Sequence, residues 1–218
     1  MVVSADLVGR RRLLVATRST HKLRELRELL AVGPEIELVS PDDVGIPDEP
    51  EETGETFETN ARLKARFYAR RSGLPTLADD SGLEVDALGG GPGVRTRRYA
   101  GPNATDAANN MKLLGELASL PADRRGARYV CVLALALPGD VGPRGGLEPL
   151  VRRGTCRGRI ATAPRGDQGF GYDPIFEPDP EPPGGRTLGE WSADEKHAIS
   201  HRSRAARRMA PVLRELGF

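Results

Sequence analysis

Two adjacent carboxylates, Asp79 and Asp80, offer the clearest chemistry in this 218-residue chain. They follow an apolar run at residues 75–78 that is typical of a buried strand, and residues 79–82 (Asp-Asp-Ser-Gly) predict the turn that ends it. Because successive side chains of a strand point to opposite faces, we expect one acid to address a ligand and the other to support it. Paired acids beside a hydroxyl suit Mg²⁺, although an Asp-rich turn uses the same residues for conformational reasons alone.

A second candidate is the polar turn at residues 17–22, Thr-Arg-Ser-Thr-His-Lys, which lies between a buried-strand pattern and leucines at helical spacing. A helix N-terminus has unpaired N–H groups that attract phosphate, so hydroxyls and cations at this point suit a triphosphate. Capping by Ser19 or Thr20 explains the hydroxyls equally well, but it does not explain Lys22. The Gly-x-x-x-x-Gly-Lys-[Ser/Thr] pattern of a P-loop is absent.

Two later segments carry groups that suit a nucleobase. Residues 169–176 read Gly-Phe-Gly-Tyr-Asp-Pro-Ile-Phe, in which Phe170 could stack on a base and Asp173 could accept a base N–H. A tight turn with core aromatic residues is the alternative. Near the final helix, residues 196–202 contain donors suited to an anion or a keto oxygen, or else they form a solvated cationic flank.

The elements that must hold these groups are predicted to alternate between strands and helices. Residues 53–73 predict a helix on which Asn60 and Lys64 share a face that either reaches a ligand or is solvated. Glu51 and Glu52, just before this helix, could supply another carboxylate to a metal held by Asp80, although acids before a helix are common for dipole reasons.

The remaining periodic segments complete the expected architecture. Residues 128–137 and 150–162 predict antiparallel strands joined by the Pro/Gly loop 138–146, and we expect them to form a second sheet layer or lobe. Other strands are expected at residues 12–17, 36–40 and 83–87, with helices after residue 19, at 105–119 and at the C-terminal end.

Composition excludes several classes of protein. Lys and Arg number 32 against 31 Asp and Glu, so the net charge of +1 gives no field for nucleic acid or an anionic membrane. No apolar stretch approaches membrane-spanning length, and residues 1–12 lack a signal core, so we expect a cytoplasmic protein. Cys131 and Cys156 are expected to be buried free thiols, and the three histidines are too scattered for a zinc site.

Taken together, these segments resemble the inosine triphosphatase family of non-canonical purine nucleoside triphosphate pyrophosphatases, over nearly the whole chain. The similar motifs are five and ordered: Ala16-Thr-Arg-Ser-Thr-His-Lys22, Glu52-Thr-Gly-Glu-Thr-Phe57 leading to Asn60-Ala61, Leu77-Ala-Asp-Asp-Ser-Gly-Leu83, Gly169-Phe-Gly-Tyr-Asp-Pro-Ile-Phe176 and Glu195-Lys-His-Ala-Ile-Ser-His-Arg202.

The resemblance implies an α/β fold, with an elongated central mixed sheet, flanking helices and two lobes around a nucleotide cleft. Residues 1–218 would form this single domain, usually as a homodimer. It also implies Mg²⁺-dependent cleavage between the α and β phosphates. Carried onto this chain, Asp80 would be the metal-linked general base, and Glu51 the second metal carboxylate, with Glu52 open as the alternative. Substrate would be bound by Thr17, Arg18, Ser19, Thr20, His21, Lys22, Ser81, Phe170, Gly171, Tyr172, Asp173, Lys196, His201 and Arg202.

Base choice has a physical basis. Hypoxanthine and xanthine present a 6-keto acceptor beside an N1–H donor, so donors from His201 or Arg202 and an acceptor such as Asp173 favour them. Adenine would leave those buried partners unpaired, at a cost of about 1–3 kcal/mol per group. Guanine shares the keto edge, so any rejection of guanine must come from its 2-amino group.

Two motifs depart from the family pattern: the family usually has Gly-Asn where this chain has Arg18-Ser19, and Glu where it has Thr59. A related pyrophosphatase of pyrimidine nucleotides is the competing enzyme, and the Phe-Gly-Tyr-Asp and Ser-His-Arg segments argue against it. A nucleotide-binding regulator would keep the same cradle and base contacts but would not need Asp80.

Overall fold

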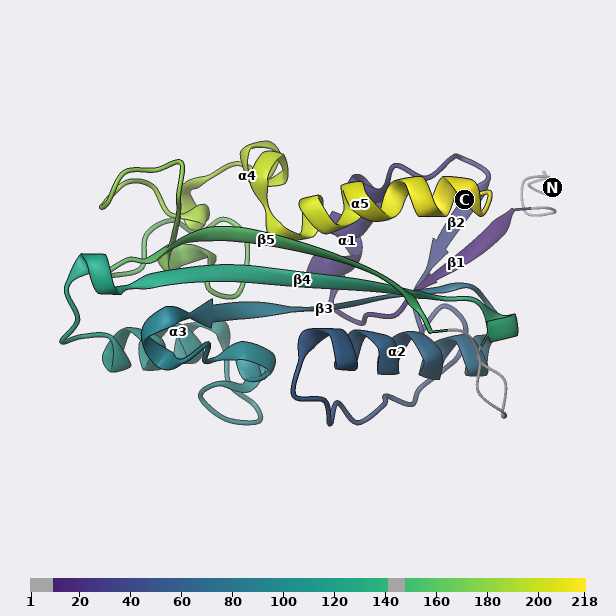
Figure 1. The fold of residues 1–218 in the computed structure, drawn as a ribbon, viewed down its shortest axis with the longest axis horizontal. Helices are drawn as coiled ribbons and strands as arrows, with labels where there is room; N and C mark the ends of the chain where they lie inside the picture. Colours follow the sequence, from purple (N-terminus) through teal and green to yellow (C-terminus); the bar gives the residue numbers. More distant parts are fainter. Residues whose placement is uncertain (1–9, 141–147) are drawn as a thin grey trace, which may run out of the picture.

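The computed structural model describes residues 10–140 and 148–218, and within them six strands form one mixed sheet in the order β2-β1-β3-β4-β5-β6. β1 (Arg11–Val15) is parallel to β2 (Ile36–Val39) and to β3 (Thr76–Val85). The pairs from β3 onward are antiparallel, through β4 (Gly126–Ala136), β5 (Leu150–Ile160) and β6 (Phe176–Pro178). Long, curved β3, β4 and β5 run along the length of the molecule (Figure 1).

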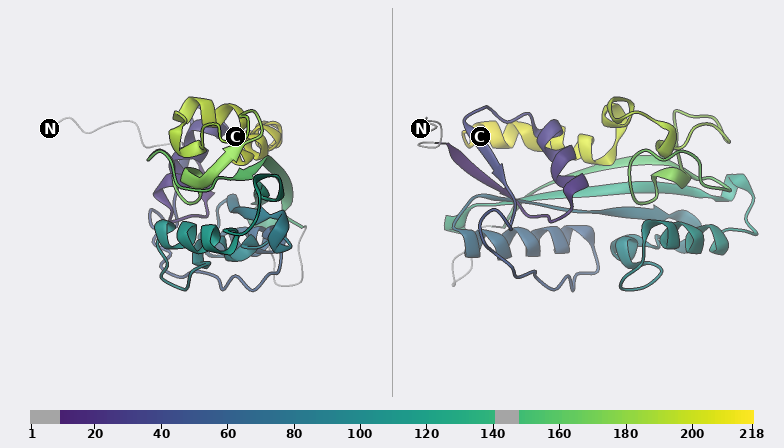
Figure 2. Two further views of the ribbon diagram at one scale, coloured as in Figure 1. Left: turned by 90° about the vertical axis from the view of Figure 1, so that its left-hand side faces the viewer. Right: turned by 180° about the vertical axis from the view of Figure 1, so that it is seen from behind.

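Helices cover both faces of this sheet (Figures 1 and 2). One face carries α1 (Thr20–Leu30), α4 (Ala193–Ile199) and α5 (His201–Glu215), and the other carries α2 (Phe57–Ser72) and α3 (Asp106–Glu116). Short 3-10 turns join them: η1 (Asp86–Leu88), η2 (Gly93–Arg98), η3 (Ala122–Arg124), η4 (Pro138–Asp140), η5 (Asp173–Ile175) and η6 (Leu188–Glu190). The α/β class with a mixed sheet and flanking helices is therefore confirmed.

The core divides according to strand alternation. Leu77 packs with Leu13 and Leu26 under α1 and α5, whereas Ala78 packs with Ala61 and Ala65 under α2. A third cluster, around Leu113, Tyr129 and Phe176, fills the far end of the sheet. Side chains that follow Ala78 on β3 therefore alternate between the α1/α5 face and the α2 face of the sheet.

Several element boundaries match the expectations and have visible causes. The Ser19 hydroxyl accepts from the Lys22 N–H and caps α1, and Thr105 caps α3 in the same way. Gly73, at φ 66°, ends α2 in the left-handed region, where a residue without Cβ is least strained. α2 begins later than residue 53, because Thr56 is its N-cap.

Two strand predictions were wrong. Residues 79–82 form no turn, and residues 83–87 do not start a separate returning strand, because β3 continues through them. The cause is its ten-residue antiparallel ladder with β4, which pairs Asp79 with Leu133 and Asp80 with Val132. β4 and β5 do pair as predicted, but in the same sheet and not in a second layer; part of their connecting loop, residues 141–147, lies outside the described residues. The single-domain, two-lobe assignment stays a prediction.

Candidate active site

Asp79 lies on the α1/α5 face of β3 and is 1% exposed. Its carboxylate accepts from Lys22 Nζ at 2.6 Å and from Arg202 Nε at 3.0 Å, and it also accepts from the Ser81 hydroxyl and the Cys131 thiol. Burial opposes the charged form, yet Arg202 and Lys22 hold the pKa of Asp79 well below its ordinary range. Asp79 is therefore an anchor whose charged form is favoured and whose acceptor positions are all in use.

From Asp79, ion pairs of alternating sign run beneath α1 toward the loop at residues 169–173. Arg202 bonds both Asp79 and Glu25, and Lys196 Nζ lies 2.9 Å from Glu25 and 2.8 Å from Asp173. Despite burial, Arg202 and Lys196 lower the pKa of Glu25 to about 2. This buried network (Lys22, Asp79, Arg202, Glu25, Lys196, Asp173) joins the two regions expected to hold the triphosphate and the base, and its charges sum to zero.

Asp173 shapes the loop that carries Phe170. Its Oδ2 accepts from the Phe170 N–H at 2.9 Å, and its Oδ1 accepts from the Tyr129 hydroxyl at 3.2 Å. A Cβ at Gly169, where φ is +77°, would come within 2.1 Å of the Asp173 carboxylate, so only glycine fits there. Tyr172 is buried and donates to a backbone carbonyl, that of Thr96. Both oxygens of Asp173 are thus engaged by the protein.

His201 opens α5 and is buried, with its ring stacked on Tyr129 at a centroid distance of 4.7 Å. Burial, followed by the charge of Arg202, holds the pKa of His201 well below its ordinary value. The imidazole is neutral at physiological pH, and its Nδ1 has no hydrogen-bond partner among the described residues. A buried polar atom of this kind suits a contact with a ligand.

Asp80 lies on the opposite, α2-facing side of β3. Its Oδ1 accepts from Lys64 Nζ at 2.7 Å, and the same ammonium contacts Glu52 at 3.0 Å and the Asp79 carbonyl at 2.8 Å. Burial raises the pKa of Asp80 and outweighs the opposing charges of Lys64 and Lys22. Asn60 does not face this cluster with a free amide, because it bonds both backbone groups of Gly54.

This second cluster fits a divalent cation that shares its ligands with a substrate. Asp80 and Glu52 converge on one positive charge, whereas Glu51 is exposed. Within residues 10–140 and 148–218, no group of three or more His, Cys, Asp or Glu side chains could hold a metal alone. Mg²⁺ typically takes one or two carboxylates and completes its shell with water and phosphate oxygens, so two acids are sufficient.

The side chains of residues 17–22 have different partners in this structure, and their joint role in holding a triphosphate stays a prediction. Lys22 enters the buried network, whereas the Arg18 guanidinium turns to Asp42, Glu49 and the Ile46 carbonyl. The Thr17 hydroxyl accepts from the Ser19 N–H and so shapes the turn. Thr20 and His21 are exposed, and the His21 ring stacks on Phe170.

Sequence reasoning missed Glu25, Tyr129 and Cys131, each of which contacts a predicted site residue. Glu25 lies three residues after Lys22 and next to inward-facing Leu26, a position that could have marked it as a buried acid. Tyr129 and Cys131 alternate on β4, so the period of two could have placed them on one face.

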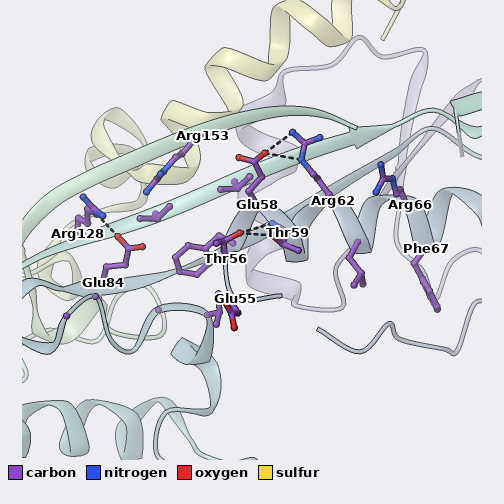
Figure 3. Close-up of a pocket in the computed structure, with 18 of the residues that line it drawn as sticks. Glu55, Thr56, Glu58, Thr59, Arg62, Arg66, Phe67, Glu84, Arg128 and Arg153 are labelled. Atoms are coloured by element: carbon purple, nitrogen blue, oxygen red, sulfur yellow. Dashed lines mark hydrogen bonds and ion pairs between the residues drawn. The ribbon is translucent and has the colours of Figure 1, made fainter. Parts of the chain in front are cut away.

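A hollow of about 1160 Å³ lies beside α2 (Figure 3), and none of the predicted binding or catalytic residues lines it. Its cations are largely paired: Arg62 with Glu58, and Arg128 with Glu84. The predicted site residues therefore lie outside the lining of this hollow, although Val132, which pairs with Asp80 across β3 and β4, belongs to it. No helix of the described residues is long and apolar enough to span a membrane.

Comparisons with known proteins agree on one group. A sequence model of the Ham1 family matches residues 13–212. A dITP/XTP pyrophosphatase of Lactobacillus acidophilus is 45% identical over 203 residues, covering 93% of this chain and 96% of that protein. A dITP/XTP pyrophosphatase of Syntrophobacter fumaroxidans is 51% identical over 193 residues, covering 88% of this chain and 78% of that protein.

Solved structures give the same result. A HAM1 protein from Coxiella burnetii superposes with a TM-score of 0.81 at 42% identity, covering 94% of this chain and 99% of that one. A nucleoside-triphosphatase, or dITP/XTP pyrophosphatase, from Mycobacterium abscessus superposes with a TM-score of 0.72 at 46% identity, covering 92% and 99%.

Proposed function

The chain belongs to the Ham1 family, and from this premise we propose how it acts on nucleotides. It is a nucleoside triphosphate pyrophosphohydrolase, and its substrates are non-canonical purine nucleoside triphosphates such as those of inosine, deoxyinosine and xanthosine. The names of the relatives at 45% and 51% identity support this substrate class. The products are the nucleoside monophosphate and pyrophosphate.

One observation supports the assignment of roles to the two adjacent acids. The carboxylate oxygens of Asp79 are fully occupied by hydrogen bonds, whereas Asp80 lies outside that network. Asp80 is buried, has a raised pKa and faces Lys64 and Glu52. A carboxylate with a raised pKa accepts a proton more readily, so Asp80 is the general base that activates water for attack. Asp79 instead holds Lys22 and Arg202 in place.

The site would hold Mg²⁺ through Asp80 and one of the two glutamates before α2. The geometry favours Glu52, which reaches the Asp80 cluster, over exposed Glu51. When bound, Mg²⁺ supplies charge neutralisation for the triphosphate. Lys22 and Lys64, on the two faces of β3, supply further positive charge, and the unpaired N–H groups at the start of α1 attract phosphate.

The base is recognised at the end of the buried network that contains Lys196 and Asp173. Phe170 offers its ring for stacking, and neutral His201 offers an unpartnered Nδ1. Asp173, Lys196 and Arg202 hold this end in shape and, in our proposal, contact the base or sugar-phosphate after exchanging one of their protein partners for substrate.

The test is an assay of purified protein and Mg²⁺ with inosine, xanthosine, guanosine and adenosine triphosphates supplied separately. We expect pyrophosphate from the first two and little turnover of adenosine triphosphate. Equal turnover of all four nucleotides would remove the argument on base selection. Binding without turnover would identify a regulator in place of an enzyme.

The cellular setting follows from the same proposal. Hydrolysis of inosine and xanthosine nucleotides would keep these bases out of DNA and RNA, and the expected place of action is the cytoplasm. A homodimer stays a prediction, which light scattering on the purified protein would test. Loss of the gene should raise the hypoxanthine content of cellular DNA.

A further inference from the structure

Phe170 is held in a fixed position by its backbone. Its N–H donates to Asp173, and the next N–H, of Gly171, donates to Asp106 at 2.7 Å. The flanking glycines adopt φ of +77° and +66°, which permits this tight loop. A ligand that stacks on Phe170 must therefore come to the ring, because the loop is tied at both sides.

Three side chains surround the Phe170 ring. Lys196 Nζ lies 4.7 Å from its centroid and Arg202 Cζ lies 5.7 Å from it. The His21 ring lies nearly parallel to it, with centroids 5.2 Å apart and planes inclined by 19°. All three thus occupy space that a stacked base would use.

These neighbours differ in how readily a ligand could replace them. Lys196 and Arg202 are buried and ion-paired. If they moved away from the ring, the buried carboxylates of Glu25 and Asp173 would lose ion-pair partners. His21 is exposed, and it contacts Phe170 through a single stacking contact, which contributes little free energy. His21 is the neighbour that can leave.

The separation of the two rings leaves no space for a third. Aromatic pairs in direct contact have centroids about 4.5–7 Å apart, and 5.2 Å falls within that range. A base inserted between His21 and Phe170 would need roughly twice the contact distance of one pair. The base and His21 therefore exclude each other from this face of Phe170.

We propose that His21 acts on the base side of the site, as a displaceable cover on Phe170 that competes with the purine ring for the same stacking face. This inference rests on the proposed function and reassigns one residue within it: Lys22 faces the phosphate end, whereas His21, its neighbour in α1, faces the base end. Because every base has a stacking face, the cover acts on all purines alike.

A base can stack only in those molecules in which Phe170 is uncovered. The apparent affinity for nucleotide is therefore the intrinsic affinity multiplied by the fraction of uncovered molecules. His21→Ala should therefore tighten nucleotide binding about two- to tenfold, with the same factor for inosine and adenosine nucleotides. His21→Phe, which keeps a stacking ring, should weaken it or leave it at the wild-type value. Arg24→Ala, an exposed change on the same helix, is the matched control.

The experiment is titration calorimetry with Mg²⁺ and two probes: a non-cleavable α,β-methylene analogue of inosine triphosphate, and inorganic tripolyphosphate, which has no base. We expect His21→Ala to tighten binding of the analogue and to leave tripolyphosphate binding unchanged. Weaker tripolyphosphate binding would place His21 in the phosphate cradle and overturn the proposal. Unchanged or weaker binding of the analogue would overturn it as well.

Failure of the proposed function is distinguishable from failure of this inference. Binding of a non-cleavable analogue does not require turnover, so an inactive wild-type protein would end the enzymatic assignment while the comparison of variants still decides the role of His21. Absence of any binding of the analogue to the wild-type protein would overturn both.

Discussion

Asp79 and Asp80 are consecutive residues of β3 whose carboxylates lie on opposite faces of the sheet. Asp79 contacts Arg202 and Lys22 beneath α1 and α5, and Asp80 contacts Lys64 beneath α2. Burial raises the pKa of Asp80, whereas two cations lower that of Asp79. One short sequence thus provides a structural anchor on one face of a single strand and, in our proposal, the reactive acid on the other.

Loss of the anchor should destabilise the fold. Asp79→Asn would leave Arg202, which is 1% exposed, without one of its two charge partners, and we expect the free energy of unfolding to fall by about 3–5 kcal/mol. Asp80→Asn is the matched control and should cost clearly less, because Lys64 keeps Glu52 and the Asp79 carbonyl. Denaturant unfolding measures both; equal losses would contradict the division of roles.

Substitutions of the two glutamates before α2 should have different effects on the Mg²⁺ concentration that the enzyme requires. Glu52 shares Lys64 with Asp80, whereas Glu51 is exposed, so Glu52→Gln should raise the Mg²⁺ concentration for half-maximal activity about tenfold or more. Glu51→Gln should leave it near the wild-type value. The reverse order would return the metal ligand to Glu51.

The buried network predicts acid sensitivity with a definite sign. The pKa of Glu25 falls from its ordinary 4.5 to about 2 in the fold, so its contribution is complete above 4.5 and is lost as the pH falls toward 2. This contribution is on the order of 3 kcal/mol. Unfolding curves across that range should slope less steeply with pH for Glu25→Gln than for wild type, whereas Glu28→Gln, a more exposed change on α1, should keep the wild-type slope.

Lys64 should set the acid limb of the pH–activity profile. Its charge favours ionised Asp80 and so opposes the rise in that pKa caused by burial. In Lys64→Met the pKa of Asp80 should rise further, and the decline of kcat/KM on the acid side should move to higher pH. An acid limb that stays in place or moves to lower pH would show that Asp80 is not the titrating base.

Local sequence predicted the parts of the fold that depend on local physics. Thr105 and Gly73 begin and end helices where their backbone preferences require, and alternation in β4 and β5 gave their pairing. The continuity of β3 could not be read in this way, because Asp-Asp-Ser-Gly has turn composition. Only the ladder to β4, together with cations on both faces, makes two acids tolerable within a strand.

The sequence indicated which residues belong to the candidate site, but it did not indicate which of them form hydrogen bonds and ion pairs with one another. Glu25 bonds Lys196, 171 residues away, and Arg202, 177 residues away, so no local pattern contains this acid's role. Asp173 was expected to contact a base; its oxygens accept from Lys196, Tyr129 and the Phe170 N–H, partners that the local sequence does not indicate, and its contact with a base stays a prediction. Residue types identified the chemistry, and tertiary contacts determine which group is free to perform it.

The most direct test of the account is the product balance of wild type and Asp80→Asn with inosine triphosphate and Mg²⁺. We predict equimolar inosine monophosphate and pyrophosphate from wild type, and a rate at least about a hundredfold lower from a folded Asp80→Asn protein that still binds nucleotide. Orthophosphate in place of pyrophosphate, or an Asp80→Asn protein that retains the wild-type rate, would contradict the central claim.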